Sequence, residues 1–169
     1  VATKYIGSRE LFWFDKVGYW FRFTPAERWR LSDGQSFDLT GNDRNAVLKR
    51  VLFSLKALSD DQRQVEMASL EAQSGDLSRH EIDPINLPMD WDQLAQMSEG
   101  GMEVMSHTHS HPVLSRLESY DDKASELSRS KQLIEDNVRG NCNAIAYPVG
   151  KFDSIDDEVL AAANDTGYD

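Results

Sequence analysis

The chain contains the segment Met102-Glu103-Val104-Met105-Ser106-His107-Thr108-His109-Ser110-His111-Pro112, in which an apolar run leads directly into three of its four histidines. In an extended chain residues 107, 109 and 111 share one face, whereas in a helical turn only residues 107 and 111 do. His107 and His111 therefore point the same way in either geometry. Two neutral imidazoles side by side suit a divalent metal, zinc above all, and a ligand set of two histidines and a carboxylate leaves a position for water.

The chain on either side of this segment alternates between strand and helix patterns. Residues 102–106 and 143–147 read as buried strands, and apolar residues between 120 and 138 recur at helical spacing among charges expected to face water. We therefore predict an α/β fold with two parallel neighbouring strands joined by a right-handed helical crossover. Gly140 is expected to end the crossover helix.

Two further helices are expected beside these strands. Asp90, with Gln93 three residues later, has the pattern of a capping box and predicts a short helix before the first strand. After the second strand, Asp153 or Ser154 is expected to cap a last helix that ends near Gly167.

The ends of the two predicted strands define a candidate site. Ligands of parallel sheets and barrels bind at the carboxyl ends of the strands, so the histidines and the turn Pro148-Val149-Gly150 should lie at one rim. The proline restricts the backbone path of this turn, and the Val149 N–H can point inward as an oxyanion-hole donor. The alternative is an ordinary turn between a strand and a helix.

The first half of the chain differs in kind, because its patterns predict helices alone. An amphipathic helix is expected to begin near Asn42 or Asp43, and Ser59 with Gln62 has the spacing of a capping box for a second helix. We interpret residues 10–86 as a helical insertion.

Composition limits the classes of function. The chain has the size of one domain, residues 1–169, and 40% hydrophobic residues are enough for a core. A net charge of −11, without a cluster of Lys or Arg, argues against nucleic-acid binding. The sequence has no apolar run long enough to predict a membrane span, and no leader pattern that would predict a signal peptide. The single Cys142 excludes an internal disulfide and is expected to be buried rather than nucleophilic. Nothing here assigns an oligomeric state or a compartment.

Two segments resemble the motifs of a known family. Residues 106–112 resemble the His-Ser/Thr-x-x-His metal motif of the polysaccharide deacetylases, the NodB-homology domain of carbohydrate esterase family 4. Residues 146–153, Ala-Tyr-Pro-Val-Gly-Lys-Phe-Asp, resemble the next motif of that family in its Tyr-Pro-x-Gly form. The two motifs occur in the family's order with a helix between them. The resemblance covers about residues 1–9 and 87–169.

This resemblance implies a partial (β/α) barrel and a divalent metal, usually zinc, held by an aspartate and by His107 and His111. In the family, water activated by the metal attacks the acetamide carbonyl of an N-acetylated sugar while an aspartate acts as base. Tyr147, Pro148 and the Val149 backbone N–H then form the catalytic turn, with the N–H in the oxyanion hole. The implied partner is an N-acetylated glycan.

The chain departs from the family pattern in several places. The Thr-Phe-Asp-Asp motif that supplies both aspartates is expected upstream of Val1, and the later motifs, with a catalytic histidine, beyond Asp169. Ala144 and Ala146 occupy the neighbourhood of an arginine that many members carry, and Val149 replaces a frequent aromatic residue. We therefore expect a central fragment of a metal-dependent deacetylase that is incomplete for activity.

Two other functions fit the same residues. An amidohydrolase-type barrel binds metal through a His-x-His pair at a strand end, which would make His107 and His109 the ligands and leave His111 dispensable. A non-catalytic glycan-binding module would keep the motif for a structural metal alone. Peptidoglycan, chitin-like oligomers, exopolysaccharides and lipid-linked glycan precursors share the same acetamide, so the sequence does not single out one glycan.

Overall fold

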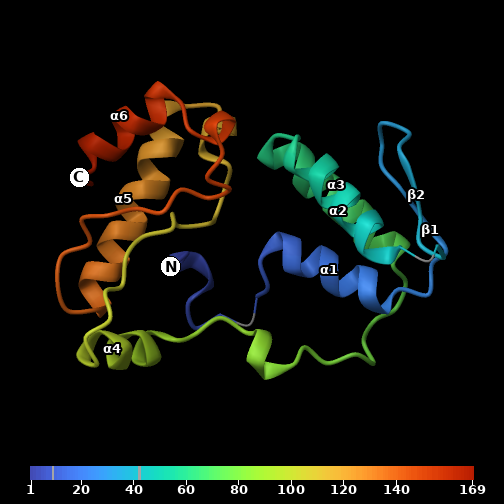
Figure 1. The fold of residues 1–169 in the computed structure, drawn as a ribbon, viewed down its shortest axis with the longest axis horizontal. Coiled ribbons are helices and arrows are strands. Elements are labelled where there is room, and N and C mark those ends of the chain that lie inside the picture. Colours follow the sequence, from blue (N-terminus) through green and yellow to red (C-terminus); the bar gives the residue numbers. More distant parts are fainter. Residues whose placement is uncertain (9, 42) are drawn as a thin grey trace. The chain divides into compact units, whose positions relative to one another are not determined.

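The computed structural model describes residues 1–8, 10–41 and 43–169. These residues form two compact units (Figure 1). Unit 1 consists of Val1–Glu10 and Leu87–Asp169, and unit 2 consists of Leu11–Asn86. Each unit has a hydrophobic core of its own. That residues 10–86 are an insertion within a single domain stays a prediction.

Unit 2 is built from α1 (Trp13–Phe23), α2 (Arg44–Lys56), α3 (Asp60–Gln73) and the 3-10 turn η2 (Pro84–Asn86), together with a short hairpin. Its core forms where the apolar faces of the helices meet. The side chains with no exposed surface there include Val17, Val51, Leu55 and Leu70. Burying aliphatic side chains of this size stabilises a small unit by roughly 2 kcal/mol each.

The hairpin in unit 2 was not predicted. Strands β1 (Arg28–Arg30) and β2 (Ser36–Asp38) pair antiparallel, with Trp29 opposite Phe37. These two central side chains are buried, whereas the residues on either side of each are exposed. The prediction of helices alone in this half is therefore wrong. A three-residue strand contributes one inward side chain, which is too little for an alternating pattern to be recognised in the sequence.

Helices α2 and α3 of unit 2 begin at the predicted capping residues. Asp43 accepts a hydrogen bond from the Ala46 N–H at 3.0 Å, so the predicted start at Asp43 is confirmed. The alternative start, Asn42, lies outside the described residues. The capping box of Ser59 and Gln62 is also confirmed, because each side chain accepts from the backbone N–H of the other.

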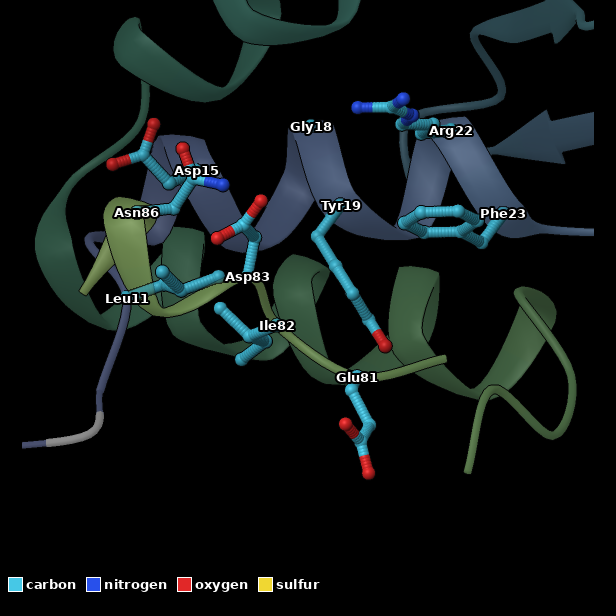
Figure 2. Close-up of a pocket in the computed structure, with 10 residues that line it drawn as sticks. All are labelled: Leu11, Asp15, Gly18, Tyr19, Arg22, Phe23, Glu81, Ile82, Asp83 and Asn86. Atoms are coloured by element: carbon cyan, nitrogen blue, oxygen red, sulfur yellow. The ribbon is translucent and has the colours of Figure 1, made fainter. Parts of the chain in front are cut away.

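Unit 2 also contains a cavity of about 430 Å³ beside α1 (Figure 2). Asp15, Gly18 and Tyr19 line it from α1, and residues of the segment 81–86 line it from the other side. The Tyr19 side chain extends from α1 toward that segment and donates a hydrogen bond to the His80 carbonyl. None of the lining residues belongs to the two predicted motifs, so this cavity is distinct from the candidate site.

Unit 1 consists of helices and short 3-10 turns connected by extended segments (Figure 1). Its core is formed largely by Leu127 and Ile134 of α5 with Val159 and Ala162 of α6, which pack against each other. The elements are η1 (Thr3–Tyr5), α4 (Trp91–Glu99), η3 (Leu114–Arg116), α5 (Tyr120–Asn137), η4 (Phe152–Ser154) and α6 (Asp157–Asp165).

The helices before and after the histidine segment agree with the sequence. The capping box of Asp90 and Gln93 at the start of α4 is confirmed, and α5 ends before Gly140, which has a φ of +110°. The expectation that the charges of α5 face water is wrong for Lys123, which is buried beside the Glu158 carboxylate. Within the described ranges, no helix is long and apolar enough to cross a membrane.

Helix α6 begins later than predicted. The Ser154 hydroxyl donates to the Lys151 carbonyl at 2.6 Å and accepts from the Lys151 N–H at 3.0 Å, so it closes η4 instead of capping a helix. Asp156 is the cap, accepting from the Val159 N–H at 2.8 Å. The prediction of Asp153 or Ser154 in this role is therefore wrong.

The two predicted strands are reduced to one parallel bridge between Ser106 and Ile145. The Ser106 N–H donates to the Ala144 carbonyl at 3.3 Å, and the Ala146 N–H donates to the Ser106 carbonyl at 2.9 Å. The prediction that the two segments are parallel neighbours is confirmed. The prediction of continuous strands over their full lengths is wrong.

Competing hydrogen bonds keep this pairing short. The Cys142 N–H donates to the Glu135 carboxylate at 3.0 Å, and the Cys142 carbonyl accepts from Lys131 at 2.6 Å. The Asn143 carbonyl accepts from the Asp169 N–H at 2.9 Å. Backbone groups that would continue the ladder are thus used elsewhere. Cys142 is buried as predicted, and burial raises the pKa of its thiol. Unit 1 is accordingly a helix-rich α/β arrangement, and the partial barrel stays a prediction.

Candidate metal and oxyanion site

The histidine segment runs between two neighbouring extended segments of unit 1. On one side, the bridge at Ser106 connects it to the second motif. On the other side, the Val1 nitrogen donates to the Met105 carbonyl at 2.5 Å, and the His107 N–H donates to the Val1 carbonyl at 2.8 Å. This alternation is the hydrogen-bond pattern of parallel strands. Residues 105–107 are therefore the middle one of three neighbouring extended segments, and the other histidines follow directly after it.

The second motif sets the tautomer of His107. Its Nδ1 atom lies 2.6 Å from the carbonyl oxygen of Ala146. A carbonyl oxygen only accepts, so Nδ1 carries the proton, and the lone pair of the neutral ring is on Nε2. Histidines that bind a metal through one nitrogen commonly donate the other N–H to such a group. His107 thus has the hydrogen bonding expected of an Nε2 ligand.

The structure brings the imidazole of His111 beside that of His107. The ring centroids are 4.6 Å apart and the ring planes are inclined by 74°. His111 and Thr108 have φ values of +62° and +66°, a region that non-glycine residues rarely adopt. The buried Thr108 hydroxyl accepts the His111 N–H at 3.1 Å and so supports this turn. Strained backbone of this kind concentrates at functional sites.

The middle histidine is held by a different part of unit 1. His109 Nδ1 lies 2.9 Å from the hydroxyl oxygen of Thr3. Burial lowers the pKa of this imidazole, and the nearby positive charge of Arg129 lowers it further. The N-terminal segment thus engages His109, whereas the second motif engages His107.

Glu126 of α5 anchors the histidine loop, and no pattern in the sequence distinguishes it from the other charges of that helix. Its carboxylate accepts from the His109 N–H at 3.0 Å, the Ser110 N–H at 2.7 Å and the Ser110 hydroxyl at 2.7 Å. The side chain is half-buried, so the expectation that it faces water is wrong. Charge-assisted hydrogen bonds of this type are the stronger ones in proteins.

The second motif forms a tight turn. Pro148 is buried and Tyr147 is half-buried against the core, where burial raises the pKa of its hydroxyl. The Gly150 N–H donates to the Pro148 carbonyl at 2.8 Å, which closes a γ-turn around Val149 with a φ of +68°. Among the described residues, none accepts a hydrogen bond from the Val149 N–H. That amide is therefore able to donate to a ligand.

The donor set fits part of a zinc site. Two neighbouring imidazoles, one with its Nε2 lone pair set by a hydrogen bond, match the nitrogen ligands that zinc prefers. A third protein ligand is not found with them, because no group of three His, Cys, Asp or Glu side chains within the described ranges could hold a metal ion.

Comparison with known protein families gives one match that covers most of the chain. Residues 51–169 match the family model described as polysaccharide deacetylase. A curated protein of Bacillus subtilis (strain 168), provisionally named polysaccharide deacetylase YxkH, is 34% identical over 77 residues. These residues are 46% of this chain and 26% of that protein. The chain thus spans about a quarter of the length of this curated relative.

Two solved structures are similar to parts of the chain. The Streptococcus pyogenes deacetylase PplD, in complex with acetate, is 30% identical with a TM-score of 0.45, over 48% of this chain and 34% of that one. A de-N-acetylase from Aggregatibacter actinomycetemcomitans is 23% identical with a TM-score of 0.42, over 53% of this chain and 44% of that one. Both TM-scores are below 0.5, so neither superposition carries an argument about the fold.

The anchoring role of Glu126 is testable by stability. Glu126→Ala removes the carboxylate that accepts three hydrogen bonds. The Ser110 N–H and hydroxyl lose this acceptor, whereas the His109 N–H keeps the backbone carbonyl of residue 126 at 3.1 Å. We expect the free energy of unfolding to fall by about 2 kcal/mol in urea denaturation. The matched control is Asp136→Ala, an exposed acid on the same helix, with an expected change below about 0.5 kcal/mol. Equal effects of the two substitutions would contradict the anchoring role.

Proposed function

The chain belongs to the polysaccharide deacetylase family, and we propose on that basis that it forms part of a metal-dependent enzyme that hydrolyses the N-acetyl group of an amino-sugar glycan. The observation that carries the proposal is the pairing of the His107 and His111 rings, with His107 Nδ1 bound to the Ala146 carbonyl. This hydrogen bond and the backbone bond from the Ala146 N–H to the Ser106 carbonyl connect the two motifs, so that a metal at the histidines would lie near the turn of the second motif. The proposed architecture is the partial (β/α) barrel of this family.

In the proposed site, His107 through Nε2 and His111 hold a divalent metal, and the two imidazoles favour zinc. When bound, such a metal polarises a carbonyl oxygen and makes water a nucleophile near neutral pH. The residues of this chain have the complementary tasks of fixing the ligand geometry and orienting the substrate. The strained turn at Thr108 and His111 and the anchor at Glu126 serve the first task.

The turn at Val149 is proposed to serve the second task. Attack on an acetamide places negative charge on its carbonyl oxygen, and a preorganised N–H stabilises that charge. The Val149 N–H has no acceptor among the described residues, and the γ-turn holds its position. Pro148 restricts the backbone before the turn, and Tyr147 anchors it to the core. The substrate is an N-acetylated glycan whose identity this geometry does not distinguish.

The alternatives differ in which histidines they use. An amidohydrolase-type site needs His107 and His109 as the ligand pair, whereas the ring contact in this structure joins His107 and His111, with centroids 4.6 Å apart. This contact favours the pair of His107 and His111. A non-catalytic glycan-binding module would keep the metal but would not need the donor at Val149, so the turn favours the enzyme.

Zinc binding by histidine variants tests the ligand assignment. In the full-length protein, His107→Ala or His111→Ala should lower zinc affinity by about a hundredfold or more in calorimetric titration, because loss of a ligand exceeds the 10–100-fold cost of losing an outer hydrogen bond. His109→Ala serves as the control and should have a mild effect. A larger loss at position 109 than at position 111 would favour the amidohydrolase site instead.

The oxyanion role of Val149 depends on its backbone N–H and not on its side chain. Because its φ is +68°, proline cannot occupy this position, and a proline variant would distort the turn. Replacing the Val149 amide with an ester deletes the N–H alone and should lower kcat about a hundredfold with unchanged zinc affinity. Val149→Gly keeps the N–H and relieves the strain, so kcat should be nearly unchanged. Full activity of the ester variant would remove this residue from the mechanism.

A further inference from the structure

Phe152 is an exposed aromatic residue in the loop that carries the proposed oxyanion donor. Its exposed fraction is 103%, and among the described residues no large apolar side chain is more exposed. Leaving a phenylalanine in water forgoes roughly 2 kcal/mol or more of burial free energy. The position of Phe152 is therefore not explained by packing within unit 1.

The backbone around Phe152 is well ordered by hydrogen bonds. On each side of it, Lys151 and Ser154 are joined by the reciprocal bonds that close η4. The Asp153 carbonyl accepts from the Ser115 hydroxyl at 2.8 Å, which connects this turn to the segment after the histidines. The ring is thus presented to solvent by a backbone that is tied to the segment after the histidine motif. Preorganisation of this kind reduces the entropy lost when a ligand binds.

Phe152 is close to the proposed reaction centre along the chain. Three Cα–Cα steps along the chain lead from Val149 to Phe152, so the two Cα atoms lie at most about 11 Å apart. If the acetamide of one sugar is bound at the Val149 N–H, the Phe152 ring is therefore close enough to contact a neighbouring sugar of the same glycan chain. The Val149 side chain, with an exposed fraction of 38%, adds apolar surface to the same loop.

The surroundings of Phe152 indicate the chemistry of its ligand. Lys151 and Asp153 flank it and both are exposed, so the ring is an isolated apolar spot between charges. A protein partner needs a larger continuous contact area. A sugar ring has one face of C–H groups and an edge of hydroxyls, which matches an aromatic ring between polar side chains.

We propose that Phe152 stacks on a sugar ring of the glycan next to the unit that is deacetylated, and so makes the enzyme prefer longer substrates. This inference rests on the proposed function, because it takes the substrate to be a glycan bound at the turn of the second motif. It gives a specificity role to a residue of the second motif that has no task in the proposed reaction.

The test compares substrate lengths in the full-length, zinc-loaded protein. The probes are the disaccharide and the pentasaccharide of N-acetylglucosamine, with acetate release as the measurement. Phe152→Ala should raise KM for the pentasaccharide about tenfold, leave kcat nearly unchanged and leave KM for the disaccharide unaltered. Phe152→Trp should restore the wild-type KM. The matched control is Phe53→Ala, which removes a side chain of 71% exposure on α2 and should change neither KM.

Two outcomes would overturn the role of Phe152: an unchanged KM for the pentasaccharide, or equal increases for both lengths. If the wild-type protein releases no acetate, the proposed function fails, and binding of the pentasaccharide by calorimetry then tests Phe152 separately. Weaker binding of the pentasaccharide by Phe152→Ala than by Phe53→Ala would still support stacking. Equal binding by the two variants would overturn it.

Discussion

The hydrogen bond from His107 Nδ1 to the Ala146 carbonyl is the interaction on which the candidate site depends. It joins the two motifs, which are far apart in the sequence, and it assigns the ring tautomer. A backbone carbonyl cannot donate, so the bond is compatible with only one arrangement of the proton. Without it, His107 could present either nitrogen toward the metal of the proposed site.

The other interactions of the candidate site are hydrogen bonds that hold the strained backbone of the two motif loops. Thr108, His111 and Val149 all have positive φ values, and all three lie in the two motif loops. Each such residue costs of order 1 kcal/mol or more, which the surrounding bonds must offset. The Thr108 hydroxyl and the Glu126 carboxylate do so for the histidine loop, and the Pro148 carbonyl does so for the second turn. The loops are therefore held in one geometry before any ligand binds.

The sequence predicted most reliably what depends on local chemistry. The caps at Asp43, Ser59 and Asp90 and the parallel pairing of the two motif segments are confirmed, because capping patterns and the strand-helix-strand order act through neighbours in the chain. The assignment of His107, His111 and Val149 to a site stays a prediction, although the structure brings the two rings together.

The errors have a common physical cause, which is competition from distant partners. The Ser154 hydroxyl is used by Lys151, so α6 begins at another cap. The backbone at Cys142 bonds to α5 side chains, so the second strand stays short. In the sequence, Glu126 resembles any other charged residue of a helix, and its role depends on its tertiary contacts with His109 and Ser110. Such contacts depend on tertiary structure, and no local pattern in the sequence reports them.

The most direct test of the account is nitrogen-15 NMR of the histidine rings in the full-length protein, recorded with and without zinc. We expect that His107 keeps a proton on Nδ1 and binds zinc through Nε2, that His111 also binds zinc, and that the His109 ring is unaffected. Zinc bound at His107 Nδ1, or a zinc-dependent shift at His109 without one at His111, would contradict it.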